Sequence, residues 1–96
     1  MSPLNKKKLD LLRTKLDKLD GELLTIIKKR SALVKDVLKL KVYKKEIIDQ
    51  KRINFILKKI RKKSIKLKID PKVTNRIWKN MIWSFIDFEN RNFKKK

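Results

Sequence analysis

Three cationic side chains lie on or beside a periodic apolar stripe in the first part of the sequence. Arg30 stands between Ile26 and Leu33, at a position that the period would otherwise give to an apolar residue. Lys41 follows eleven residues later, about three helical turns, so it shares the face of Arg30. Arg13 lies 17 residues before Arg30 and still further from Lys41, so one small ligand cannot touch both Arg13 and Lys41 of the same helix. In an antiparallel pair of helices, Arg13 of one chain could approach the Arg30–Lys41 region of the other. An unpaired guanidinium on an apolar face is costly, so Arg30 predicts an anion nearby, either a structural acid or a ligand.

Two acidic residues lie where they would complete such a site. Asp49 and Arg52 are one helical turn apart, which suits a surface ion pair as well as a binding site. Glu89 continues the apolar stripe of Ile82 and Phe85, which places a carboxyl group on an apolar face. Each residue has a structural explanation by itself, but all of these polar exceptions are compatible with a single pocket.

The sequence contains no cysteine and no histidine, which excludes several kinds of chemistry. Zinc sites built on Cys and His, Ser-His-Asp and Cys-His catalysis, and disulfides all need residues that are missing. Any chemistry must therefore use Lys, Arg, Asp, Glu and hydrogen bonds.

The charge is strongly positive, with 30 Lys and Arg against 10 Asp and Glu, a net charge of +20. Solvated lysines that keep a small protein in solution explain it as well as attraction to nucleic acid, acidic lipid or a small polyanion. A non-enzymatic nucleic-acid-binding protein is one alternative. It is disfavoured because the lysines are spread along the chain and aromatic residues are not interleaved with them for base stacking.

The apolar periodicity predicts an all-α fold of one very long helix and two shorter ones. We expect helices over about 4–42 and 48–64, then a third helix that opens at Asp70-Pro71 and runs to about Glu89, with a frayed tail at 92–96. The long helix carries apolar residues at alternating steps of three and four: Leu9, Leu12, Leu16, Leu19, Leu23, Ile26, Leu33, Val37 and Leu40. We call these residues the seam.

Two short helices cannot cover a seam of this length, so the sequence predicts a homodimer whose long helices pair. The 96 residues suit a single domain, 1–96. No apolar run approaches the length of a membrane span, and the chain is expected to be soluble and cytoplasmic.

A set of residues distributed over about 4–92 has a characteristic spacing. Its members are Leu12-Arg13, Leu16-Asp17, Asp20, Leu23-Leu24, Lys29-Arg30, Lys41, Ile48-Asp49-Gln50-Lys51-Arg52, Ile56-Leu57, Arg76-Ile77-Trp78, Met81-Ile82 and Glu89. With this set the sequence resembles the all-helical class of chorismate mutases. The resemblance implies an intertwined homodimer of three-helix chains. It also implies an isomerase that converts chorismate to prephenate on the route to Phe and Tyr. The reaction is pericyclic and requires no cofactor or metal.

The resemblance also implies residue roles. Arg13 of the partner subunit and Arg30 would hold the two carboxylates of chorismate. Asp49 would hold the ring hydroxyl, and Arg52 would support the carboxylate site.

Lys41 and Glu89 would donate hydrogen bonds to the ether oxygen as its bond breaks, and with Arg30 they form the expected catalytic set. The sequence departs from the family at Ile53, where a Glu is usual, and at Phe85, where a small polar residue is common. An isochorismate–pyruvate lyase of the same fold is the alternative with a similar site. The departures at Ile53 and Phe85 also leave open a regulatory or degenerate member of the family with a pocket but little turnover.

Overall fold

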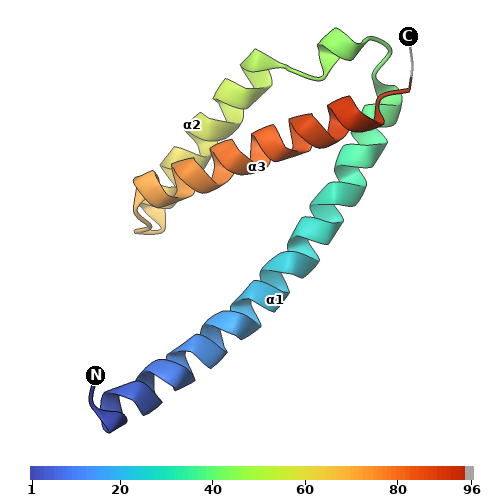
Figure 1. Ribbon diagram of the computed structural model, residues 1–96. Helices are drawn as coiled ribbons and strands as arrows, with labels where there is room; N and C mark the ends of the chain where they lie inside the picture. Colours follow the sequence, from blue (N-terminus) through green and yellow to red (C-terminus); the bar gives the residue numbers. More distant parts are fainter. Residues whose placement is uncertain (95–96) are drawn as a thin grey trace. The chain divides into compact units, whose positions relative to one another are not determined.

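The computed structural model describes residues 1–94 and is helical throughout, with no β-strand in this part of the chain (Figure 1). Its elements are α1 (Pro3–Leu40), the short 3-10 helix η1 (Lys44–Glu46), α2 (Gln50–Lys66) and α3 (Pro71–Asn92). The prediction of an all-α chain with one very long and two shorter helices is confirmed. Of the tail predicted at 92–96, residues 95–96 lie outside the described residues.

Side-chain caps set the start of each long helix. The backbone N–H of Asn5 donates to Ser2 Oγ at 3.2 Å, and that of Lys72 donates to the Asp70 carboxylate at 2.9 Å, with Pro71 in the first helical position. Asp49 caps α2 by accepting from the backbone N–H of Arg52 at 3.0 Å. The second helix therefore begins at Gln50, two residues later than predicted, because an N-cap residue has extended backbone angles.

The chain divides into two compact units, Met1–Leu33 and Val34–Lys96, and each is described by itself. The first unit is most of α1, a single amphipathic helix. Over its whole length α1 has no fully buried residue, and the seam leucines from Leu12 to Leu23 are more than half exposed.

The second unit contains the hydrophobic core. Four isoleucines are buried there: Ile47, Ile53, Ile82 and Ile86. Four partly buried residues pack against them: Leu38, Ile56, Leu57 and Phe93. α2 and α3 run antiparallel, side by side (Figure 1). At the far end of this hairpin, Ser64 and Thr74 share a buried hydrogen bond of 2.7 Å. The apolar stripe that the sequence predicts for the third helix consists of Ile77, Trp78, Met81, Ile82 and Phe85. All are buried or partly buried except Ile77, which is 51% exposed.

No helix in the described part of the chain has the combination of length and hydrophobicity that a bilayer-spanning segment needs.

Candidate active site

A buried ion pair joins the end of α1 to the end of α3. The Lys41 ammonium donates to Glu89 Oε2 at 2.6 Å, and the two side chains are only 17% and 9% exposed. Lys41 directly follows the last residue of α1, and its backbone N–H still bonds to the carbonyl of Leu38 at 3.1 Å. The two charges are 48 residues apart in sequence, so tertiary packing alone brings them together.

The position of Glu89 follows from the periodicity of α3. Ile82, Ile86 and Glu89 are separated by steps of four and three, and all three are buried. A carboxylate buried on this apolar line is tolerated when a cation pairs with it, and Lys41 is that cation. The prediction that Glu89 lies on the apolar face is confirmed.

Lys41 and Asp49 line one open depression of about 530 Å³. Glu46, Ile48, Gln50 and Lys51 complete its wall. Sequence reasoning did not single out Glu46, which lies in the connection between α1 and α2 and accepts from the backbone N–H of Tyr43 at 3.0 Å. Its sequence signal is weak: Glu46 is the one acidic residue between Lys41 and Ile48.

Asp49 and Arg52 meet through the backbone of Arg52. The Asp49 carboxylate accepts the Arg52 backbone N–H, whereas the Arg52 guanidinium lies 5.5 Å from the centre of the Phe55 ring on the exposed surface of α2. Asp49 is thus held in place as an N-cap. The sequence signal for this was an Asp just before a helical pattern, a strong N-cap preference.

The two departures from the family pattern have different surroundings. Ile53 is buried in the isoleucine core, so the structure places an aliphatic side chain where the family usually has a carboxylate. Phe85 is partly buried on α3, one turn before Glu89.

Arg13 and Arg30 both lie on α1 in the unit Met1–Leu33. Arg13 is exposed and Arg30 is partly buried. The second unit therefore contains four of the six site residues predicted from the sequence. In this unit Lys41 pairs with Glu89 and shares a depression with Asp49, which in turn accepts from the backbone N–H of Arg52.

The family model described as chorismate mutase type II matches residues 12–90 of the chain. The chain belongs to the chorismate mutase type II family. All six predicted site residues fall within the matched segment. Comparison with curated proteins and with solved structures gave no significant match.

Chorismate mutases are isomerases, and the resemblance stated from the sequence is confirmed at the level of the family. The chemistry of the group around Lys41 fits such an enzyme. It offers ammonium N–H donors and a carboxylate acceptor in a partly desolvated setting, where hydrogen bonds are stronger than in bulk water.

Proposed function

We propose that this chain converts chorismate to prephenate and that Lys41, held by Glu89 beside Asp49, is the centre of its active site. The observation that carries the proposal is the buried 2.6 Å contact between Lys41 and Glu89. The family match makes chorismate the substrate to test first.

The rearrangement needs two things from the protein. The flexible substrate dianion must be held in a folded, chair-like conformer, which lowers the entropic part of the barrier. Negative charge that grows on the ether oxygen must also be stabilised by donors that are already oriented. An ammonium has three N–H donors, and Glu89 uses one of those on Lys41, so others remain for that oxygen.

The role proposed for Glu89 has two parts. In the structure its carboxylate accepts from Lys41 and so fixes the position of the ammonium. A carboxyl group donates only when it carries a proton. Donation from Glu89 to the ether oxygen therefore requires its protonated form, in which the other carboxyl oxygen can still accept from Lys41.

The arginines suit the substrate carboxylates because a planar guanidinium binds a carboxylate through two parallel hydrogen bonds. We assign Arg30 and Arg13 of the partner subunit to the two carboxylates and Arg52 to their support. We assign Asp49 to the ring hydroxyl, since its carboxylate lines the depression that Lys41 also lines.

A homodimer is part of the proposal. The seam of the first unit is exposed, with Leu12, Leu16 and Leu23 at 56%, 57% and 52%. Within the second unit, Leu38 packs on the core while the seam residue Leu40 is 80% exposed, so the seam does not face the chain's own core. Such a long apolar stripe, interrupted only at Arg30, is covered most simply by a second copy. A role in Phe and Tyr synthesis and a cytoplasmic location remain predictions.

The direct test is an assay of purified protein with chorismate, followed by absorbance and with the product identified by NMR. We expect prephenate, and we expect Arg30→Ala to lower kcat/KM by about 10²-fold or more. Lys29→Ala removes a neighbouring exposed charge and serves as the matched control.

Isochorismate is the second substrate for the same assay. Release of pyruvate from isochorismate without turnover of chorismate would assign the chain to the lyase instead. No turnover of either substrate would contradict the proposal.

A further inference from the structure

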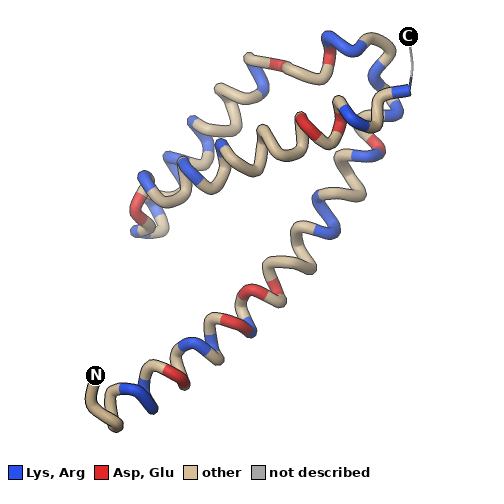
Figure 2. The backbone as a smooth tube through the Cα atoms, in the orientation of Figure 1, with Lys and Arg blue, Asp and Glu red and all other residues tan. Residues whose placement is uncertain are grey.

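The α2–α3 hairpin carries a concentration of positive charge that the active site does not use. Twelve basic residues and one acidic residue, Asp70, lie within 50–86. The Asp70 carboxylate is already occupied as the N-cap of α3. Figure 2 shows basic residues along both helices of this hairpin. Of the twelve, only Arg52 is assigned to the proposed site and only Lys51 lines its depression.

On α2, Lys58 and Arg61 are one turn apart and exposed. They lie on one flank of the buried line that runs through Ile53 and Ser64. On α3, three exposed residues follow at steps of three and four and form a second row: Arg76, Lys79 and Trp83. This row lies on one flank of the buried line through Ile82 and Ile86.

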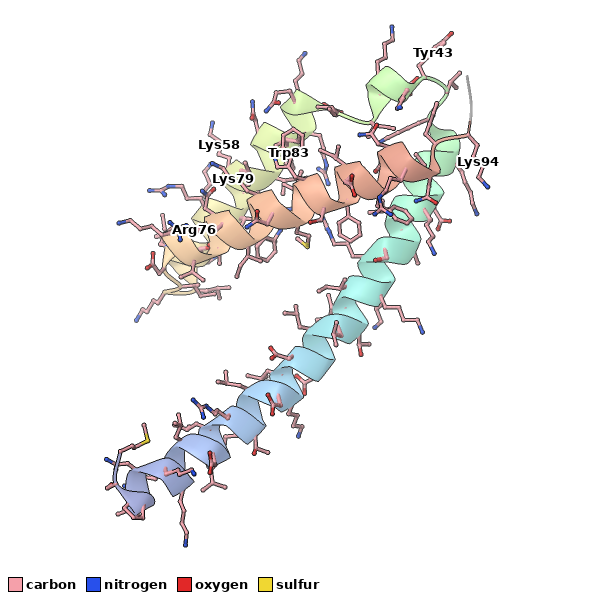
Figure 3. All side chains as sticks on the ribbon, in the orientation of Figure 1. Tyr43, Lys58, Arg76, Lys79, Trp83 and Lys94 are labelled. Carbon is pink, nitrogen blue, oxygen red and sulfur yellow. The ribbon has the colours of Figure 1, made fainter. Side chains whose placement is uncertain are left out.

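Both flanks are on the same side of the hairpin. In a pair of right-handed helices packed antiparallel, the rotation from the buried line is counted about each helix axis in the direction of the chain. Residues displaced from the buried line of their own helix by the same rotation then lie on the same side of the pair. Figure 3 shows Lys58, Arg76, Lys79 and Trp83 near one another along the hairpin. We call these four residues and Arg61 the outer basic face.

The outer basic face has few competing contacts within the described part of the chain. None of its five residues lines the depression at Lys41. The next acidic residue along the α3 row, Asp87, is paired with Arg91 at 2.8 Å. Trp83 is 49% exposed, which leaves part of its ring open to a ligand.

We propose that the outer basic face binds single-stranded nucleic acid, with phosphates on Lys58, Arg61, Arg76 and Lys79 and a base stacked on Trp83. Cations that follow the backbone and an aromatic ring for the bases are the two components of sequence-independent single-strand binding. The row from Arg76 to Trp83 spans about 10 Å along α3.

This interpretation differs from the expectation for the sequence as a whole, where the basic residues are dispersed and no aromatic residue is interleaved with them. Antiparallel packing changes this, because it brings cations of α2 beside cations and a tryptophan of α3. A lipid surface fits less well, because membrane-surface helices insert a broad apolar face and this face has one aromatic residue among four cations.

The test is a titration of the full chain with a 15-nucleotide oligo(dT), followed by tryptophan fluorescence at several salt concentrations. We expect quenching and a slope of log K against log[salt] of about −2.8, from four phosphate contacts at about 0.7 each. Arg76→Ala/Lys79→Ala should reduce the slope to about −1.4 and weaken binding at low salt by on the order of 10-fold to 100-fold.

Two further variants separate stacking from charge. Trp83→Ala should keep the slope, abolish most of the quenching and weaken binding about fivefold or more. Lys6→Ala/Lys7→Ala removes the same charge from exposed positions in the first turns of α1 and should leave the slope unchanged. Turnover of chorismate by each variant reports whether it is folded, independently of nucleic acid.

Three results would overturn the proposal. The first is an equal loss of binding in Lys6→Ala/Lys7→Ala and in Arg76→Ala/Lys79→Ala, which would indicate a diffuse basic coat. The second is unchanged Trp83 fluorescence on binding, or equal binding of heparin, which would indicate attraction by charge alone. The third is tighter binding to phosphatidylglycerol vesicles than to oligo(dT), which would assign the face to anionic lipid.

Discussion

Lys41 and Glu89 stabilise each other because each neutralises the buried charge of the other. Their side chains are 17% and 9% exposed, so both charges have lost most of their water. Breaking such a pair by removing one partner leaves an uncompensated charge, whereas replacing both partners with apolar side chains is often tolerated. At this scale, stability and the proposed catalysis can be separated by experiment.

We expect Lys41→Ala to destabilise the fold by about 3–5 kcal/mol because Glu89 loses its cation. It should also reduce kcat by on the order of 10²-fold to 10³-fold through loss of the donor to the ether oxygen. Lys41→Met/Glu89→Leu should recover the stability but not the activity. Urea denaturation and the chorismate assay measure the two effects.

Lys39→Ala is the control for this comparison. Lys39 lies 3.8 Å from Asp36, and both side chains are at least 70% exposed, so this pair contributes little. Full activity in Lys41→Met/Glu89→Leu would remove Lys41 from the catalytic site.

α2 and α3 begin in the same way, each with an Asp whose carboxylate accepts a backbone N–H of the first turn. The distances are 3.0 Å to the Arg52 N–H at Asp49 and 2.9 Å to the Lys72 N–H at Asp70. Asp49 differs because its side chain also lines the depression that contains Lys41. The cap therefore fixes the carboxylate of a proposed substrate contact, and the two aspartates form a matched pair for experiment.

We expect Asp49→Ala and Asp70→Ala to cost similar stability, about 0.5–2 kcal/mol each, because each removes one helix cap. Asp49→Ala should in addition raise KM for chorismate or lower kcat, whereas Asp70→Ala should leave both unchanged. Thermal unfolding and steady-state kinetics make the comparison. Equal kinetics in the two variants would mean that Asp49 is only a cap.

For the whole molecule, the exposed apolar seam is the main surface that the chain itself does not cover. It runs along α1 through both units. Leu16 in the first unit and Leu40 in the second are both more than half exposed. A dimer that pairs these helices would also bring Arg13 of one chain to the site of the other. This arrangement is testable without a structure of the dimer.

Mixing Arg13→Ala chains with Arg30→Ala chains should restore activity. If Arg13 acts in the partner's site, each mixed dimer has one intact site, and random exchange gives about a quarter of the wild-type activity. If Arg13 and Arg30 act within one chain, no site in the mixture is intact and activity stays at the level of the single variants. Analytical ultracentrifugation of the wild type checks that the chain is dimeric.

The amino-acid sequence by itself determined the local features of this protein. The three-four spacing of apolar residues gave the helices, since the helical period places those residues on one face. Asp70-Pro71 gave the start of α3, and the position of Glu89 on the apolar line was readable from its spacing to Ile82. The residues around Arg13, Arg30 and Lys41 were enough to place the chain in its family, as the match over 12–90 confirms.

Only the tertiary structure decided which distant residues meet. It paired Lys41 with Glu89 across 48 residues, buried Ile53 in the core, exposed Ile77, and brought the cations of α2 to the same side as Trp83. Periodicity fixes which face of a helix a residue occupies, but not which other helix that face packs against. That choice depends on the antiparallel docking of α2 on α3, where the burial of both apolar faces together sets the arrangement.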